Sequence, residues 1–166
     1  MNAISRTEVA PPDSAAIAFT LNGRDVAARP GETILEVADR EGIPIPRLCY
    51  QDGLEPAGNC RSCMVEIQGE RVLAPSCCRA PAPGMQVASD SERAIKAQKM
   101  VLELLQSDLP ETPHTRHNEV DQWARRLDLG LPRFAPREQP MPDVSHPAIA
   151  RSRKRIAAMR IIPVHP

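Results

Sequence analysis

The sequence predicts a small α+β domain, and three observations carry that prediction. A period-two apolar pattern lies on either side of Asn22-Gly23, which is the strongest short-range signal of a β-hairpin. A helix-capping pattern follows from Thr33 to Glu36, and further short alternating segments lie between residues 64 and 88. Two hairpins with one helix packed across them favour a β-grasp arrangement, followed here by two helices and an extended, proline-rich tail.

The composition excludes several classes of protein. The 166 residues include 21 basic and 21 acidic side chains and are 42% hydrophobic, which excludes a globally basic nucleic-acid binder and a highly charged disordered chain. No stretch approaches the roughly 18 consecutive apolar residues of a membrane span, and the first eight residues lack the apolar core of a signal peptide. We therefore expect a cytoplasmic protein without a membrane span.

The predicted domain runs from residue 15 to residue 90 and follows a flexible leader over residues 1–14, which shows no periodicity. The Thr33 hydroxyl and the Glu36 carboxylate match a capping box, and Gly42 is placed to end that helix. Strands are predicted at residues 17–21, 24–27, 64–67, 71–74 and 85–88, with a loop over 44–58. The side chains expected to face the core are Ile17, Phe19, Leu21, Ile34, Val37, Ala38, Val65 and Ile67.

A helical segment is predicted over residues 91–130. Ser89 and Glu92 match a second capping box, and Asn118 is placed to cap a further helix that stops at Gly130. The apolar stripe of the first helix, within residues 92–106, is formed by Ile95, Val101, Leu102 and Leu105. That of the second is formed by Val120, Trp123, Ala124 and Leu127.

The five cysteines are concentrated in one part of the chain, between Cys49 and Cys78. Five thiols cannot all pair internally, and without an export signal a disulfide framework is not expected. Cys49 is followed after ten residues by Cys60, after two more by Cys63 and after a further thirteen by Cys77. This cluster predicts metal or redox chemistry.

Four kinds of cysteine site are considered as explanations of this spacing. Zinc commonly takes two paired knuckles or one knuckle with two histidines, whereas only Cys60 and Cys63 form a knuckle here. A thioredoxin-like pair would open a helix, but this pair precedes a strand. Structural cysteines pack as small hydrophobes, and the glycine, proline and polar residues around Cys49, Cys60 and Cys63 argue against a core location. One knuckle with two single cysteines favours a [2Fe–2S] cluster.

The turns between the cysteines agree with that interpretation. A [2Fe–2S] cluster with four thiolates is an anion, and backbone amides in glycine-rich turns can offset its charge. Turns of this kind are predicted at Asp52-Gly53, at Ala57-Gly58-Asn59 and at Arg61-Ser62, which also adds one cation.

The cysteine-bearing segments resemble the N-terminal [2Fe–2S] domain of the large iron–sulfur subunit of complex I and its relatives. Those relatives include NAD-reducing hydrogenases and the α subunit of NAD-linked formate dehydrogenase, and the ten-residue first gap is typical of this group. The amino-acid sequence around Val72–Cys77 and Pro81–Met85 is most similar to that of the formate dehydrogenase α subunit. The resemblance covers nearly all of residues 16–148, and the segments that carry it are residues 48–50, 58–67, 74–77, 94–105, 117–124 and 143–148.

The resemblance implies that Cys49, Cys60, Cys63 and Cys77 bind the [2Fe–2S] cluster and that Cys78 is spare. It implies an oxidoreductase subunit that passes electrons between a formate site and a flavin-bearing, NAD-binding subunit, with the remaining iron–sulfur and pterin part of the complex as further partner. The alternatives are a ferredoxin-like module of a hydrogenase or NADH dehydrogenase, and a zinc-stabilised or degenerate fragment without redox activity. No residue of this chain is predicted to be catalytic.

The predicted tail over residues 131–166 is rich in proline, since nine of the 18 prolines follow Ser107. Residues 145–166 carry five basic and no acidic side chains. We therefore interpret residues 149–166 as an out-of-frame end of a truncated chain, because the resemblance implies further [4Fe–4S] clusters and a pterin domain. The basic end also fits a solvated charged helix, and its scarcity of aromatic residues does not favour nucleic-acid binding. The histidines interpreted as surface residues are His114, His117 and His146.

Overall fold

The computed structural model describes residues 16–109, 118–134, 143–146 and 149–151. The leader predicted over residues 1–14 and most of the predicted tail lie outside these residues. The elements in chain order are β1 (Ile17–Leu21), β2 (Arg24–Ala28), α1 (Ile34–Arg40), β3 (Met64–Ile67), β4 (Ala74–Pro75), β5 (Gln86–Ala88), α2 (Glu92–Ser107), α3 (Glu119–Arg126), β6 (Asp143–His146) and β7 (Ile149–Arg151). The predicted α+β class is confirmed.

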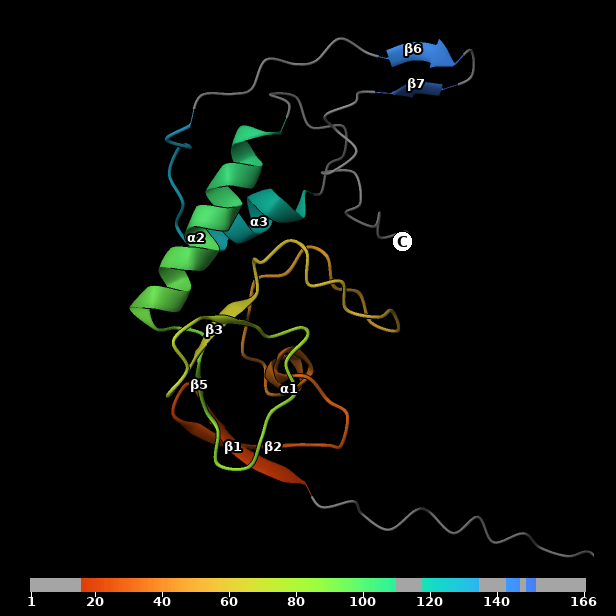
Figure 1. The fold of residues 1–166 in the computed structure, drawn as a ribbon. Helices are drawn as coiled ribbons and strands as arrows, with labels where there is room; N and C mark the ends of the chain where they lie inside the picture. The colour runs from red at the N-terminus through yellow and green to blue at the C-terminus, as the bar shows by residue number, and fades with distance from the viewer. Residues whose placement is uncertain (1–15, 110–117, 135–142, 147–148, 152–166) are drawn as a thin grey trace, which may run out of the picture.

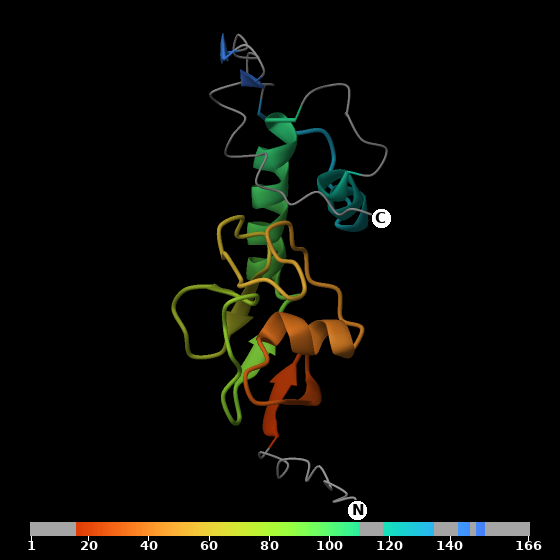
Figure 2. The ribbon, with the colours of Figure 1, turned by 90° about the vertical axis from the view of Figure 1, so that its right-hand side faces the viewer.

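The main sheet is mixed and has the strand order β2-β1-β5-β3-β4. Strand β5 lies at its centre, parallel to β1 and antiparallel to β3. Helix α1 crosses one side of this sheet, whereas α2 rises from its end and α3 lies beside α2 (Figures 1 and 2). The arrangement is the expected β-grasp domain with two added helices, and the cysteine-bearing loop runs between α1 and the α2–α3 pair.

The first hairpin turns at Asn22 and Gly23, whose φ angles are 52° and 73°. Two consecutive left-handed residues form the turn whose twist matches that of the strands. The Asn22 side chain also accepts a hydrogen bond from the Ser89 backbone N–H (2.7 Å) and donates one to the Ser89 hydroxyl (2.9 Å). The predicted capping box at Ser89 is therefore wrong: Ser91 caps α2 by accepting from the Ala94 N–H at 3.1 Å.

Helix α1 begins with the predicted capping box. The Thr33 N–H donates to the Glu36 carboxylate (2.6 Å), and the Glu36 N–H donates to the Thr33 hydroxyl (3.3 Å). The first of these bonds is the main reason why the pKa of Glu36 lies below its ordinary value. Ile34, Val37 and Ala38 are buried as predicted, and so is Leu35. The helix therefore presents a broad apolar face to the sheet.

The second hairpin is shorter than predicted. Val65 and Ile67 of β3 are buried as expected, but only Ala74 and Pro75 of the returning segment pair with it. The strand predicted over residues 71–74 is therefore wrong for its first three residues, and the Val72 side chain is 60% exposed. A two-residue β4 is enough to place the residues that follow it beside the start of β3.

Helices α2 and α3 keep the predicted apolar faces only in part. Leu102 and Val120 are fully buried, whereas Ile95, Val101 and Leu105 are partly exposed. The Asn118 side chain caps α3 as predicted, by accepting from the Val120 N–H at 3.0 Å. The helix ends before the predicted stop at Gly130, because Leu127 is the C-cap and Asp128 has a φ of 52°.

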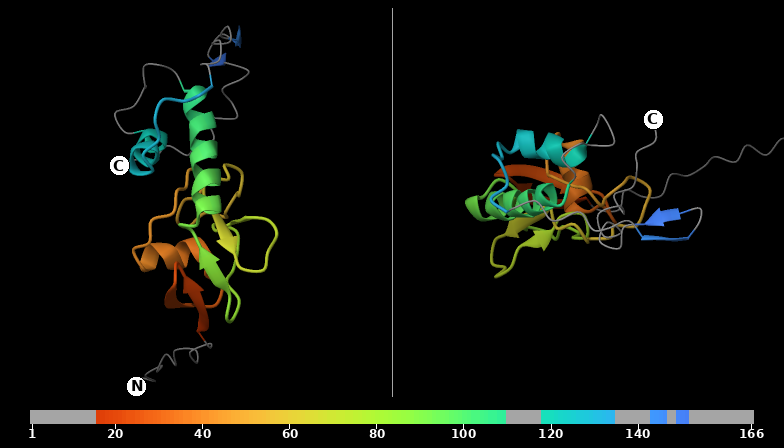
Figure 3. Two further views of the ribbon diagram at one scale, coloured as in Figure 1. Left: turned by 90° about the vertical axis from the view of Figure 1, so that its left-hand side faces the viewer. Right: turned by 90° about the horizontal axis from the view of Figure 1, so that it is seen from above.

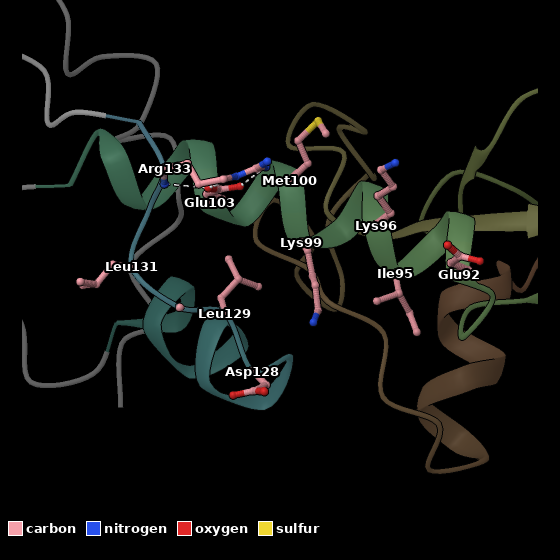
Figure 4. Close-up of a pocket in the computed structure, with 11 residues that line it drawn as sticks. Glu92, Ile95, Lys96, Lys99, Met100, Glu103, Asp128, Leu129, Leu131 and Arg133 are labelled. Carbon is pink, nitrogen blue, oxygen red and sulfur yellow. Dashed lines mark hydrogen bonds and ion pairs between the residues drawn. The ribbon is translucent and has the colours of Figure 1, made fainter.

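A pocket separates α2 from the segment that follows α3, and the Glu103–Arg133 ion pair spans one end of it (Figure 4). The Arg133 guanidinium donates to both Glu103 oxygens at 2.8 and 2.7 Å, and the Arg133 N–H donates at 2.8 Å. These bonds lower the pKa of Glu103 to about 2. Such a depressed pKa means that the carboxylate stabilises the fold above its ordinary pKa of 4.5, and that this contribution is lost as the pH falls toward 2.

We expect the Arg133→Gln variant to raise the pKa of Glu103 toward its ordinary value while the backbone N–H of residue 133 still holds it somewhat below. The measurement is an NMR titration of the Glu103 carboxyl carbon in the wild-type chain and in the variant. An unchanged pKa in the variant would show that the guanidinium does not cause the shift.

Strands β6 and β7 form a separate antiparallel pair that the sequence analysis did not predict (Figure 3). They fall within the segment that was expected to be an extended tail. None of the helices in the described part of the chain combines the length and the apolar character that crossing a membrane requires.

Candidate iron–sulfur site

The four cysteines singled out by their spacing lie in two pairs near the junction of the sheet and the helices. Cys49 and Cys60 belong to the loop between α1 and β3. Cys63 comes directly before β3, and Cys77 comes shortly after β4. No disulfide joins these described cysteines.

Cys63 and Cys77 form the inner pair, with their Sγ atoms 3.4 Å apart. The pairing of Met64 with Pro75 brings the two chain segments together, and the Ser76 N–H donates to the Cys63 carbonyl at 3.0 Å. Both thiols are buried in the main hydrophobic core, 2% and 1% exposed. The expectation that polar flanks keep Cys49, Cys60 and Cys63 out of the core is therefore wrong for Cys63.

The inner pair is electrostatically tuned by its own hydrogen bond. Contact with Cys77 lowers the pKa of Cys63 to about 6, and the same contact together with burial raises the pKa of Cys77. The Ser76 hydroxyl also acts to lower the pKa of Cys63 and has no other partner among the described residues. A thiolate is the form in which cysteine binds a metal, and two sulfurs this close together can bind the same metal ion.

Cys49 and Cys60 form the outer pair, and both are partly buried. The Cys60 backbone N–H donates to the Cys49 sulfur at 3.4 Å, and the Ser62 hydroxyl lies 3.1 Å from the Cys60 sulfur. Burial raises the pKa of Cys49, and the amides of Cys60 and Asn59 oppose that rise. Of the turns predicted to offset the charge of an anion, only that at residues 57–59 contributes an amide here, that of Asn59, and the Cys60 N–H beside it is the amide that donates to sulfur.

The loop that carries the outer pair bends through left-handed residues on both sides of Cys60. Gly58 has a φ of 61° and Arg61 a φ of 59°. A Cβ at Gly58 would meet the Cys78 sulfur at 2.9 Å, so a larger residue would strain this left-handed position and displace the Cys78 side chain. The turns predicted on either side of Cys60 are therefore present, and they fold this loop tightly around the thiols.

Three residues to which the sequence assigned no role of their own hold the outer pair in place. Arg47 forms an ion pair with Asp39 of α1, and the Tyr50 hydroxyl donates to the Glu36 carboxylate at 3.1 Å. Leu48, which is 4% exposed, packs against the apolar faces of α2 and α3. Contacts on both sides of Cys49 therefore fix its backbone. The signal for these roles was position alone, since all three residues lie within two residues of a cysteine.

Cys78, the cysteine that the family resemblance leaves without an assigned role, is exposed. Its sulfur nevertheless lies 3.4 Å from that of Cys77, within the same group of thiols. This proximity means that loss of the Cys77 side chain leaves a second thiol within a short distance.

The donor set fits a dinuclear cluster. Two irons bridged by sulfide need two thiolates each, and the chain supplies two pairs, together with backbone amides at the outer pair. In the described ranges, no three or more His, Cys, Asp and Glu side chains are grouped as ligands of one metal ion.

Comparisons with known proteins identify this region. Residues 14–92 match the family model of the 2Fe-2S iron-sulfur cluster binding domain. The chain is 41% identical over 96 residues to the mitochondrial 78 kDa subunit of NADH-ubiquinone oxidoreductase from Candida albicans, covering 58% of this chain and 13% of that subunit. It is also 41% identical over 100 residues to the NADP-reducing hydrogenase subunit HndD of Solidesulfovibrio fructosivorans, covering 57% and 17%. The alignments thus span less than a fifth of these relatives.

A solved structure supports the same conclusion. A chain in the crystal structure of an NAD+-reducing [NiFe]-hydrogenase in the H2-reduced state superposes with a TM-score of 0.68 at 31% identity. The match covers 80% of the present chain and 58% of that chain, so it extends beyond the sheet and α1. Residues 14–92, a little under half of the chain, therefore resemble a 2Fe-2S iron–sulfur cluster binding domain, and the cofactor that these comparisons support is a [2Fe–2S] cluster.

Proposed function

We propose that the chain carries single electrons as part of the α subunit of a cytoplasmic, NAD-linked formate dehydrogenase. The observation that carries the electron-transfer role is the arrangement of the cysteines in two close pairs, with a backbone amide directed at sulfur. A [2Fe–2S] cluster accepts and releases one electron at a time. The chain itself supplies the thiolates, offsets their charge and limits access of water.

In this proposal Cys49 and Cys60 bind one iron, and Cys63 and Cys77 bind the other. Their spatial pairing supports this assignment, because each iron needs two thiolates. Cys78 is not a ligand, since it is exposed and the family resemblance selects the thirteen-residue gap that ends at Cys77. We assign no catalytic residue to this chain.

The choice of parent enzyme rests on text outside the cysteines. Val72–Cys77 and Pro81–Met85 resemble the formate dehydrogenase α subunit. Its partners would then be a flavin-bearing, NAD-binding subunit and the iron–sulfur and pterin part that oxidises formate. A module of an NADH dehydrogenase or hydrogenase is the second candidate, favoured by the identity of 41% to subunits of both kinds. The neighbouring genes distinguish the two, because each complex needs its own companion subunits.

The experiment that tests cluster binding is anaerobic reconstitution of the full chain with iron and sulfide. We expect about two irons and two inorganic sulfides per chain, with the visible absorption of a [2Fe–2S] centre that bleaches in part on one-electron reduction. A parallel sample loaded with zinc is the control, since zinc is colourless and has no redox chemistry. A chain that binds zinc tightly but retains neither iron nor sulfide would contradict the proposed function.

A further inference from the structure

The cysteine-bearing loop is covered by a second hydrophobic cluster that belongs to the added helices. Leu48, Leu102 and Val120 form its buried centre and are 4%, 0% and 1% exposed. Cys60 and Trp123 pack against this centre from the loop and from α3. The outer thiol pair is therefore bordered by side chains from outside the β-grasp sheet, and the views agree that α3 lies next to this loop (Figures 1 and 2).

Helix α2 is tied to the sheet by a buried glutamine. The Gln98 side-chain amide, on a residue only 1% exposed, donates to the Met64 carbonyl at 2.9 Å and to the Ser89 carbonyl at 3.1 Å. Met64 directly follows Cys63, so this link joins α2 to the backbone next to the inner pair. A polar side chain this deeply buried with both bonds made holds its helix in one position.

We propose that α2 and α3 form a helical cover over the outer thiol pair, and that Val120 and Trp123 act as positioning residues that keep water from this side of the cluster. The inference rests on the proposed function and adds a role for the helical segment. The geometry supports it because the packing centre contains Leu48, next to Cys49, and is contacted by Cys60 itself.

The consequence of the cover is a lower reduction potential. Reduction adds a negative charge to a cluster that is already an anion, and water stabilises the more highly charged state more strongly. A dry, covered site therefore favours the oxidised form. Opening the cover would raise the potential and give iron chelators easier access to the outer pair.

The test uses the reconstituted full chain with Trp123→Ala and Val120→Ala, and with Leu104→Ala as a matched control. Leu104 lies on α2 but is 45% exposed, so its loss leaves the cover intact. At the solution potential where the wild-type cluster is half reduced, we expect the reduced-to-oxidised ratio of the cover variants to rise at least about threefold. Iron release to a ferrous chelator should accelerate in the same variants, and the control should match the wild type in both measurements.

The outcomes separate this inference from the proposed function. If the wild-type chain binds no cluster, the proposed function fails and the inference fails with it. If Trp123→Ala and Val120→Ala hold two irons per chain with wild-type potential and release rate, the inference alone is overturned. If only one of the two variants retains the cluster, the reduction potential of that variant is compared with that of the Leu104→Ala control. A higher potential supports the inference, and an unchanged potential overturns it.

Discussion

Replacement of Cys63 with alanine is expected to abolish the [2Fe–2S] cluster, with loss of both irons, both sulfides and the visible absorption. Cys63 is 2% exposed and lies within the core, 3.4 Å from Cys77, so exogenous thiols cannot easily take its place. The measurement is iron and sulfide content after anaerobic reconstitution, with far-UV circular dichroism to confirm that the apo-variant folds.

Cys78→Ala is the matched control, because it removes a thiol of the same segment that is exposed and is not assigned as a ligand. This variant should retain about two irons per chain and the wild-type spectrum. Cys77→Ala is a less direct test, since the Cys78 sulfur lies 3.4 Å from that of Cys77. The Cys78 thiol could then take the place of Cys77 as a ligand. Replacing both Cys77 and Cys78 with alanine removes this possibility and should abolish the cluster, as Cys63→Ala does. Full cluster content in Cys63→Ala would refute the ligand assignment.

The features that were predicted correctly from the sequence are those that short-range chemistry specifies. Asn22-Gly23 needs only its own φ angles to form the hairpin turn, and Thr33 with Glu36 caps α1 through bonds that span three residues. The spacing of the cysteines indicated the cofactor for the same reason. The number of cysteines and the gaps between them can be read directly from the sequence, as can the residues of each short turn.

The errors arise where a distant residue competes for a side chain. Ser89 matches a capping box, but Asn22, 67 residues away, takes both its hydroxyl and its N–H. Val72 alternates correctly for a strand, yet β4 has only two residues and leaves that side chain in solvent. The role of Gln98 could not be predicted, because hydrophobic periodicity considers only apolar residues. Its side chain donates hydrogen bonds to the Met64 and Ser89 carbonyls, which only the fold brings near it.

The site shows the same division. The glycine, proline and polar neighbours of Cys49, Cys60 and Cys63 predicted a position outside the core for these three cysteines. The pairing of the buried residues Val65 and Ala74 instead brings Cys63 and Cys77, a few residues further along each segment, together within the core. Burial depends on the register of two strands, which a single sequence does not specify locally.

Replacement of Leu35 with alanine is expected to lower the free energy of unfolding by about 2–5 kcal/mol, the usual cost of the lost burial and the cavity that remains. Leu35 is fully buried in the cluster that contains Cys63 and Cys77, and its N–H donates to the Ser76 carbonyl at 3.1 Å. Chemical denaturation followed by far-UV circular dichroism measures the effect. Leu104→Ala, a helical leucine that is 45% exposed, should change stability by less than about 0.5 kcal/mol. Because Leu35 packs in the same core as the inner pair, its loss should also speed the release of iron. Equal losses of stability in Leu35→Ala and Leu104→Ala would contradict the core described here.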